Sequence, residues 1–501
     1  MNEKLQTLKR KLAVINDLQS AAAVLSWDQA TYMPAGGAAA RGRQLATLSR
    51  LSQEMFIDDA VGNLLDDLKA YEASLPYDDD DASLLRVTRR AYDRAVKIPP
   101  QLIAELTEHM TASYQAWAVA RPNNDFASMI PALEKTVELS RQIASYFDHE
   151  HIADPLIDNS DYGMTAASTR QLFANLRREL VPLVAKIREQ ADIDTAILHQ
   201  TFPEAKQRAF GEMVIKKYGY QFERGRQDLT LHPFMTKFSL GDVRITTRFQ
   251  ENDLGDGLFS TLHESGHAMY EQGINMAYEG TALANGTSSG VHESQSRLWE
   301  NIVGRSRGFW QHYYPQLQQT FPDQLGTVPL DHFYRAINRV SPSLVRVDAD
   351  EVTYNLHVMI RFDLELELLE GSLAVKDLPD AWHARYESDL GMRAPDDRDG
   401  VLQDVHWYAG LVGGSFQGYT LGNVMSAAFY DQALMAEPRI SAEITQGNFD
   451  TLHNWLKTNI YQHGAKFTAP ELIERVMGGE LTIDPYINYL KGKFGKLYGL
   501  S

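Results

Sequence analysis

The chain has 501 residues, of which 44% are hydrophobic, 10% aromatic and 23% charged, proportions typical of a globular protein with a large core. Its 66 acidic and 48 basic residues give a net charge of −18, which disfavours nucleic acid and anionic membrane surfaces as partners. Cysteine is absent, which excludes disulfides, thiolate metal ligands and a cysteine nucleophile.

The N-terminal segment has the pattern of an amphipathic helix and lacks the apolar core of a secretion signal. Its apolar residues recur every three or four positions, at Leu5, Leu8, Leu12, Ile15 and Leu18. No later stretch approaches the ~18 consecutive apolar residues that cross a bilayer. We therefore expect a cytoplasmic protein.

Helical periodicity continues through most of the chain. It marks residues 102–147, 168–190, 331–336, 352–369 and 451–461. Prolines and glycines interrupt the pattern at Pro34 with Gly36 and Gly37, at Pro99 and Pro100, and at Gly478 and Gly479. Because the sequence has no internal repeat and no flexible linker, we expect residues 1–501 to form a single, mainly α-helical domain.

Two segments depart from the helical pattern. Residues 78–81 are four consecutive aspartates, which we interpret as a solvated loop because calcium loops alternate their ligands and this run does not. In residues 243–249, every second residue belongs to one set, Val243, Ile245, Thr247 and Phe249, and the residues between them are Arg244, Thr246 and Arg248. That period of two predicts a strand with one buried face.

A His-Glu-x-x-His motif lies within residues 261–269. On a helix, His263 and His267 stand one turn apart on the same face, so both rings can reach one tetrahedral zinc ion. Glu264 lies beside the first ligand and can take a proton from a metal-bound water. The apolar neighbours indicate a buried helix, Gly266 permits another backbone to approach it closely, and buried histidines require a partner such as a metal.

A catalytic zinc site needs a third protein ligand. The downstream candidates are Glu271, Glu279, His292, Glu293 and Glu300. Glu271 follows His267 by one turn of the same helix. Three side chains in a row along one helix cannot surround a single ion. A second helix over residues 292–301, returning antiparallel to the first, would present Glu293 to the metal, with Glu300 two turns further along. Two histidines and a glutamate form a thermolysin-like ligand set, so we assign zinc to His263, His267 and Glu293.

Further motifs occur in a specific order around this segment. They are Trp27-Asp-Gln-Ala-Thr-Tyr-Met-Pro-Ala-Gly36, His232-Pro-Phe234, Asp242-Val-Arg244-Ile-Thr246, His292-Glu-Ser-Gln295, Val345-Arg346-Val-Asp-Ala-Asp350 and Gly400-Val-Leu-Gln403-Asp404-Val-His406-Trp407. With this set, the chain resembles the carboxypeptidase Taq family of metallocarboxypeptidases over nearly its whole length.

The resemblance implies a zinc-dependent carboxypeptidase of broad specificity that releases single amino acids from the free C-terminus of peptides. It implies the same three metal ligands, His263, His267 and Glu293, and Glu264 as the general base. Zinc, cobalt and manganese can share such a ligand set, with zinc the expected metal.

The resemblance also assigns residues to the substrate. Arg346 is the implied anchor for the C-terminal carboxylate, a role that suits the planar fork of a guanidinium. The motifs around Arg244 and His406 are implied to close the groove. Tyr419 is the expected donor to the developing oxyanion, and His232 is a further pocket candidate.

The implied fold is mainly α, a neurolysin-like helical zincin with a deep active-site groove. The zinc core would occupy about residues 232–300, and the groove motifs about residues 345–420. A sheet edge at residues 243–249 would flank the zinc helix and bind the substrate backbone by strand addition. The resemblance further implies a homodimer.

Other interpretations remain open for single residues. Arg346 could form an ion pair with Asp350 one turn away, and Arg244 could be an exposed strand residue. The sequence Gly286-Thr-Ser288-Ser-Gly290 matches the G-x-S-x-G motif of serine hydrolases, but that motif requires a strand before it and a helix after it in an alternating α/β chain. A connector between the two zinc-ligand helices explains it better.

Two rival functions remain at this point. One is an endo-acting zinc oligopeptidase of the same architecture, which would have no need of Arg346 as a carboxylate anchor. The other is a non-catalytic helical metal-binding protein, against which Glu264 argues, because an inactive site gains nothing from a general base.

Overall fold

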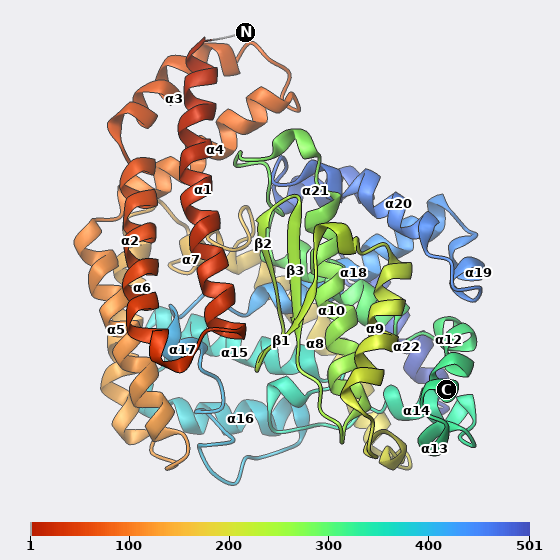
Figure 1. Cartoon of the computed structure of the whole chain (residues 1–501). Coiled ribbons are helices and arrows are strands. Elements are labelled where there is room, and N and C mark those ends of the chain that lie inside the picture. Colours follow the sequence, from red (N-terminus) through yellow and green to blue (C-terminus); the bar gives the residue numbers. More distant parts are fainter. Residues whose placement is uncertain (1–2, 501) are drawn as a thin grey trace.

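The computed structural model describes residues 3–500, which fold into helices around one small sheet (Figure 1). The helices that precede the sheet are α1 (Glu3–Thr31), α2 (Ala38–Phe56), α3 (Asp59–Glu72), α4 (Asp80–Lys97), α5 (Pro100–Ala120), α6 (Ile130–Ala144), α7 (Asp154–Ile157), α8 (Ala166–Arg188) and α9 (Glu204–Tyr218). The strands are β1 (Gln227–Leu229), β2 (Phe234–Ser239) and β3 (Asp242–Thr247).

The helices that follow the sheet form the rest of the described chain. They are α10 (Leu254–Gly273), α11 (Ser289–Arg297), α12 (Arg307–Thr320), α13 (Pro322–Leu325), α14 (Leu330–Ile337), α15 (Tyr354–Glu370), α16 (Leu378–Leu390), α17 (His406–Ala409), α18 (Gln417–Ala436), α19 (Ile440–Ile444), α20 (Asp450–Asn459), α21 (Ala469–Met477) and α22 (Asp484–Tyr498). A π-helical stretch, Leu298–Val303, continues directly from α11. No helix in the described part of the chain is both long and apolar enough to cross a membrane.

Prolines and glycines end the helices where the sequence predicts. A turn at Pro34 separates α1 from α2, and α5 begins at Pro100, where the missing amide hydrogen of proline costs no helical hydrogen bond. Gly478 ends α21 with a φ of 74°, a conformation that glycine adopts readily. The periodic segment 102–147 forms two helices, α5 and α6, because the chain turns after Ala120 at Arg121-Pro122.

The expectation that residues 78–81 form a loop is wrong in part, because only Asp78 and Asp79 lie outside a helix. The carboxylate of Asp79 accepts hydrogen bonds from the N–H groups of Asp81 and Ala82 and so caps α4, which begins at Asp80. Acidic residues in a first helical turn also interact favourably with the helix dipole. Asp80 and Asp81 therefore belong to the helix.

The sheet has the order β1-β3-β2, with β1 parallel and β2 antiparallel to β3. Val243 and Ile245 are fully buried, as the alternating pattern predicts. The expected sheet edge at residues 243–249 is wrong, because β3 is the central strand and its backbone is paired on both sides. The strand also ends at Thr247, and Phe249 packs against Gly257 at the start of α10. Within the described chain, the outer edges of β1 and β2 pair with no further strand.

The sheet lies between the N-terminal helices and the pair α9 and α10 (Figure 1). The larger of two apolar clusters surrounds α10, α11, α15 and α18 and extends to the C-terminal helices. The smaller one joins the N-terminal helices to later segments. Its members include Leu5, Leu8, Leu65, Leu68, Leu84, Leu85, Leu240, Ile274, Leu283 and Ala465. Both terminal parts of the chain therefore contribute to the surroundings of α10.

Candidate metal centre

Helix α10 presents two histidines on one face. Asp253 starts the helix by accepting hydrogen bonds from the N–H groups of Gly255 and Asp256. His263 and His267 follow one turn apart, with ring centroids separated by 4.9 Å. Most of α10 is buried, so these two rings are fixed by the packing around them.

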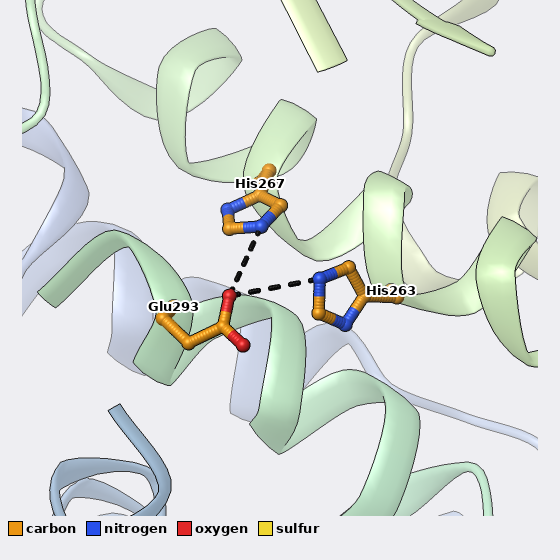
Figure 2. Close-up of side chains that lie close together, drawn as sticks. All are labelled: His263, His267 and Glu293. Carbon is orange, nitrogen blue, oxygen red and sulfur yellow. Dashed lines mark ion pairs between the residues drawn. The ribbon is translucent and has the colours of Figure 1, made fainter. Parts of the chain in front are cut away.

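Helix α11 runs antiparallel to α10 and brings Glu293 to the two histidines (Figure 2). Its Oε2 atom lies 3.6 Å from Nε2 of His263 and 3.4 Å from Nε2 of His267. The close approach depends on Gly266, where an added Cβ would lie 2.5 Å from the carbonyl oxygen of Gln295. The sequence-based role of this glycine is therefore confirmed.

The three side chains have the arrangement that a divalent ion requires. One ligand atom from each of His263, His267 and Glu293 can be chosen so that all lie within 4.8 Å of one another. Two imidazole nitrogens and one carboxylate oxygen are the donor set of catalytic zinc sites, which leave a fourth position for water or substrate. Although burial opposes it, the Arg297 guanidinium lowers the pKa of Glu293 well below its usual range, so this carboxylate is ready to bind a cation.

The outward-facing nitrogen of His263 also has a partner. Its Nδ1 atom lies 2.8 Å from Oε2 of Glu300, whose carboxylate also interacts with Arg297 and Arg305. Glu300 lies in the π-helical stretch that follows α11, and such stretches frequently occur at functional sites. Glu300 thus orients the first histidine and is not a third ligand.

The second histidine begins a longer chain of hydrogen bonds. Nδ1 of His267 lies 2.7 Å from Nδ1 of His292, and Nε2 of His292 lies 2.9 Å from Oε1 of Glu271. The other oxygen of Glu271 accepts a hydrogen bond from Lys237 of β2 at 2.7 Å. Despite burial, the contacts with His292 and Lys237 lower the pKa of Glu271 to about 2. Glu271 and His292, two of the candidate ligands, are therefore outer partners of the metal site.

Glu264 differs from these carboxylates because its side chain has no hydrogen bond to any described residue. This side chain is only 7% exposed and lies next to His263 in the chain. Burial raises the pKa of Glu264 to about 7, and a cation bound by the neighbouring ligands would oppose that rise. A buried, unpartnered carboxylate beside a metal site is suited to receive and return a proton.

Arg346, His406 and Tyr419 come together around Asp404. The Nε and Nη2 atoms of Arg346 each donate to the Asp404 carboxylate at 2.9 Å, and Nη1 donates to the hydroxyl of Tyr354 at 3.0 Å. Nδ1 of His406 lies 2.9 Å from Oδ1 of Asp404, and its Nε2 lies 3.4 Å from the hydroxyl of Tyr419. Arg346, His406 and Tyr419, which the sequence places far apart, therefore form one cluster.

The alternative ion pair between Arg346 and Asp350 is wrong. The carboxylate of Asp350 accepts hydrogen bonds from the N–H groups of Ser341, Val352 and Thr353 and so fixes the backbone before α15. Arg346 pairs with Asp404 instead, a residue far away in the sequence.

Arg244 is partly buried on β3, so its interpretation as an exposed strand residue is also wrong. Its guanidinium donates twice to Asp242 and lies over the rings of Trp27 and Phe238, at 4.5 and 4.8 Å from their centroids. His232 is exposed in the turn before β2 and makes no hydrogen bond with a described residue. The structure does not bring His232 into contact with the other predicted residues.

The Gly-Thr-Ser-Ser-Gly sequence connects the two ligand helices, as expected. The hydroxyl of Ser288 accepts a hydrogen bond from the N–H of Val291 and caps α11. At Gly286, an added Cβ would lie 2.6 Å from the ring of His292. The motif therefore caps α11 and leaves room for the ring of His292. The connection contains no strand before the serine.

A pocket of about 600 Å³ opens beside the metal ligands. His263, Arg297, Glu300 and Tyr354 belong to its wall. This volume lies in the range of small-ligand sites and provides room for a substrate residue next to the first histidine.

Three residues of this region are not predicted from the sequence. Lys237 stabilises Glu271 from a different element, and Asp404 binds Arg346 across 58 positions, so no local pattern indicates either contact. Arg297 donates to Glu293 at 2.7 Å. Its position four residues after Glu293 is a recognisable ion-pair spacing that could have predicted this contact.

Known proteins are similar to this chain over nearly its whole length. The family model described as Carboxypeptidase Taq (M32) metallopeptidase matches residues 7–494. Thermostable carboxypeptidase 1 of Thermus thermophilus is 39% identical over 493 residues, with 96% of each chain covered. Carboxypeptidase 1 of Bacillus subtilis is 35% identical, covering 97% of this chain and 96% of the relative.

Solved structures agree with this relationship. The crystal structure of an M32 carboxypeptidase from Deinococcus radiodurans covers 100% of both chains with a TM-score of 0.97 and 51% identity. The family resemblance, the mainly α-helical zincin fold and the class of peptide-hydrolysing enzymes are therefore confirmed. The chain belongs to the carboxypeptidase Taq (M32) family of metallopeptidases.

Proposed function

We propose that this protein is a zinc-dependent carboxypeptidase that hydrolyses the last peptide bond of peptides and releases single amino acids with broad specificity. The observation that carries this proposal is the buried Glu264 carboxylate, free of hydrogen bonds, beside the donors His263, His267 and Glu293. A purely structural metal site would use its fourth position for another ligand and would not need a base.

The ligand set favours zinc, and cobalt or manganese could occupy the same donors. When bound, such an ion polarises a peptide carbonyl and lowers the pKa of water, which supports hydrolysis near neutral pH. His263 and His267 bind through Nε2, because Glu300 and His292 occupy their Nδ1 atoms. These outer contacts hold both rings in the orientation that the ligand role requires.

Glu264 acts as general base and then as general acid in this proposal. It takes a proton from the attacking water and returns it to the leaving amine. Burial raises the pKa of this carboxyl and a bound cation opposes that rise, so the group can both gain and lose the proton that each turnover moves.

Tyr419 is the proposed donor to the oxyanion that forms from the peptide carbonyl, and His406 positions its hydroxyl. Burial raises the pKa of Tyr419, so its hydroxyl remains protonated and can donate. His406 is held by Asp404 through Nδ1, and its Nε2 points to the Tyr419 hydroxyl. Hydrogen bonds of this kind stabilise charge that develops in the transition state.

Arg346 is the proposed anchor for the free C-terminal carboxylate of the substrate. Three of its five N–H groups donate to Asp404 and Tyr354, which leaves two for a ligand. Tyr354 also links the anchor to the metal ligands, because the Arg297 guanidinium lies 4.7 Å from the centre of its ring. A short connection between anchor and metal would restrict hydrolysis to the last bond.

Arg244 and His232 complete the proposal with a smaller role. Arg244 lies on β3 of the sheet that packs against α10, and His232 lies in the turn before β2; we assign both to the part of the groove that holds more distant substrate residues. The expected homodimer and the cytoplasmic location stay predictions.

The test compares peptides with a free C-terminus and the same peptides with an amidated C-terminus, with and without a chelator. We expect sequential release of amino acids from the free-acid peptides only, abolished by the chelator. Glu264→Gln should lower the rate by about 10²–10⁴-fold while the metal stays bound. Equal activity of Glu264→Gln and wild type would contradict the proposed base.

One observation favours an endo-acting oligopeptidase as the second candidate. Asp404 already neutralises Arg346, so the carboxylate anchor has less charge to offer than a free arginine. In that case the amidated peptides would be cut internally, and Arg346→Gln would leave their hydrolysis unchanged. For the carboxypeptidase, Arg346→Gln should raise KM for free-acid peptides, and Asp404→Asn should affect the same substrates.

A further inference from the structure

Helix α4 carries a row of basic residues outside the metal centre. Arg86, Arg90, Arg94 and Lys97 follow one another at intervals of four, four and three residues, so they share one face of the helix. This face lines a pocket of about 530 Å³, whose opposite wall includes Phe147, Asp158, Tyr162 and Thr287. The pocket has the size of a small-molecule site.

None of the four cations forms an ion pair with a described carboxylate. Arg86 and Arg94 donate hydrogen bonds to backbone carbonyls, of Tyr77 and Lys466 and of Pro155 respectively, and an aromatic ring lies against each of the three guanidinium groups. Arg86 lies 3.8 Å from the ring centre of Tyr77, Arg90 lies 4.0 Å from that of Tyr162, and Arg94 lies 4.7 Å from that of Phe147. The Arg90 side chain makes no hydrogen bond within the described structure, so aromatic contact fixes it without neutralising its charge.

The carboxylates of Asp158 and Glu471 act on Arg90 electrostatically without forming an ion pair with it, and each already accepts a hydrogen bond. Asp158 accepts a hydrogen bond from the N–H of Gly163 at 3.0 Å. Glu471 accepts from the hydroxyl of Tyr77 and from the N–H of Thr468. Glu72, at the rim, lies 3.5 Å from Arg89. The Asp93 carboxylate is the remaining acid of the pocket wall.

This arrangement is unfavourable without a ligand. Like charges spaced four residues apart destabilise a helix. Burial lowers the pKa of both Arg90 and Arg94, which indicates that their charge is not fully compensated by the protein. The same charges occur in a chain of net charge −18, in which carboxylates are plentiful. An anionic ligand would explain why none of them is paired here.

We propose that this pocket binds a small phosphate-bearing molecule through Arg86, Arg90, Arg94 and Lys97. Guanidinium groups bind phosphate oxygens through paired N–H donors, and a dianion can satisfy two of them at once. The overall negative charge of the protein disfavours a large polyanion such as nucleic acid. The volume of the pocket favours a single small molecule.

The test measures the binding of inorganic phosphate and glycerol phosphate to the metal-loaded enzyme by calorimetry, at constant ionic strength in chloride. Arg90→Glu is the main variant, because the Arg90 side chain has no hydrogen bond whose loss would disturb the fold. Arg50→Glu is the matched control, since Arg50 is an exposed arginine on α2. We expect Arg90→Glu to weaken both ligands at least tenfold, and Arg50→Glu to leave binding unchanged.

Several results would overturn the proposal. Phosphate bound at the metal centre would bind wild type and Arg90→Glu equally. Succinate bound as tightly as phosphate would identify a carboxylate site, and no saturable binding to wild type would exclude an anion site. If Arg90→Glu melts early, Arg90→Gln provides the same comparison with a smaller change. Peptide hydrolysis by the folded variants should equal that of wild type.

Discussion

At the metal centre, every ring nitrogen that faces away from Glu293 has a hydrogen-bond partner. Because Glu271 is a carboxylate, it accepts the proton on Nε2 of His292. Nδ1 of His292 then has a lone pair and accepts the proton on Nδ1 of His267. The remaining lone pair of His267, on Nε2, points to Glu293 and the metal position. A buried glutamate thus selects the histidine tautomer that binds metal.

This chain of hydrogen bonds predicts a graded effect of substitutions at His292. His292→Ala removes the acceptor for His267 and should weaken metal binding by about 10–100-fold. His292→Asn keeps an oxygen near the Nδ1 position and should lose less. Titration with a competing metal indicator measures both affinities. Equal affinities for wild type and His292→Ala would show that the outer histidine has no part in orienting the ligand.

Among the elements, α10 and α11 must approach closely for Glu293 to meet both histidines. Gly266 permits this contact, and the space of its missing side chain is filled by the backbone at Gln295 and Ser296. Backbone cannot move aside as a flexible side chain can.

Gly266→Ala should therefore push the two helices apart. We expect a loss of about 1–3 kcal/mol in the free energy of unfolding, together with weaker metal binding. Gly492→Ala is the control, because an added Cβ on α22 meets nothing within 4 Å and alanine favours a helix. Denaturant unfolding and metal titration of the two variants test the prediction. A Gly266→Ala protein with unchanged metal affinity would contradict it.

Helix α15 contains a buried glutamate, Glu365, that affects how stability depends on pH. Oε1 of Glu365 accepts a hydrogen bond from the Trp407 indole at 3.0 Å, whereas Oε2 is buried without a partner. Burial raises the pKa of Glu365 to about 8. Between pH ~4.5 and 8 the unfolded chain ionises this group while the folded protein keeps its proton, so the stability contributed by this group falls as pH rises.

Glu365→Gln removes this titration. The variant should gain about 3–4 kcal/mol relative to wild type when the pH is raised from about 5 to 8. Unfolding in denaturant at the two pH values gives the difference, and comparison at equal pH cancels the other titrating groups. The exposed Glu108→Gln should show no such change. A parallel pH dependence of wild type and Glu365→Gln would rule out the raised pKa.

The sequence predicts elements and ligands where the signal is local. The helix-spaced histidines, the alternating strand and the capping glycine at Gly478 each follow from the residues themselves. The central position of β3 does not, because a strand pattern contains no information on how many neighbours pair with it. Likewise, the pairing of Arg346 with Asp404 depends on the packing of distant segments.

At the scale of the whole molecule, the metal position joins two helices in the middle of the larger core. A bound ion therefore stabilises the folded state by mass action, with about 4 kcal/mol at a thousandfold excess over Kd. For a chain of 501 residues, this corresponds to a shift of a few degrees in Tm.

Chelation should accordingly lower the Tm of wild type by a few degrees in calorimetric scans. Glu264→Gln, whose ligands are intact, should show the same shift although it is inactive. His263→Ala should show a much smaller one, because its ion is already weakly held. A full shift in His263→Ala would mean that the chelator acts elsewhere in the protein.

The smaller apolar cluster also has a consequence for synthesis of the chain. Its N-terminal members, such as Leu5 and Leu84, pack against Leu240, Ile274 and, near the other end, Ala465. A ribosome that adds about 5–20 residues per second needs tens of seconds to pass from α4 to this last contact. During that time the apolar faces of α1, α3 and α4 lack their final covering, so the nascent N-terminal helices are natural clients for chaperones.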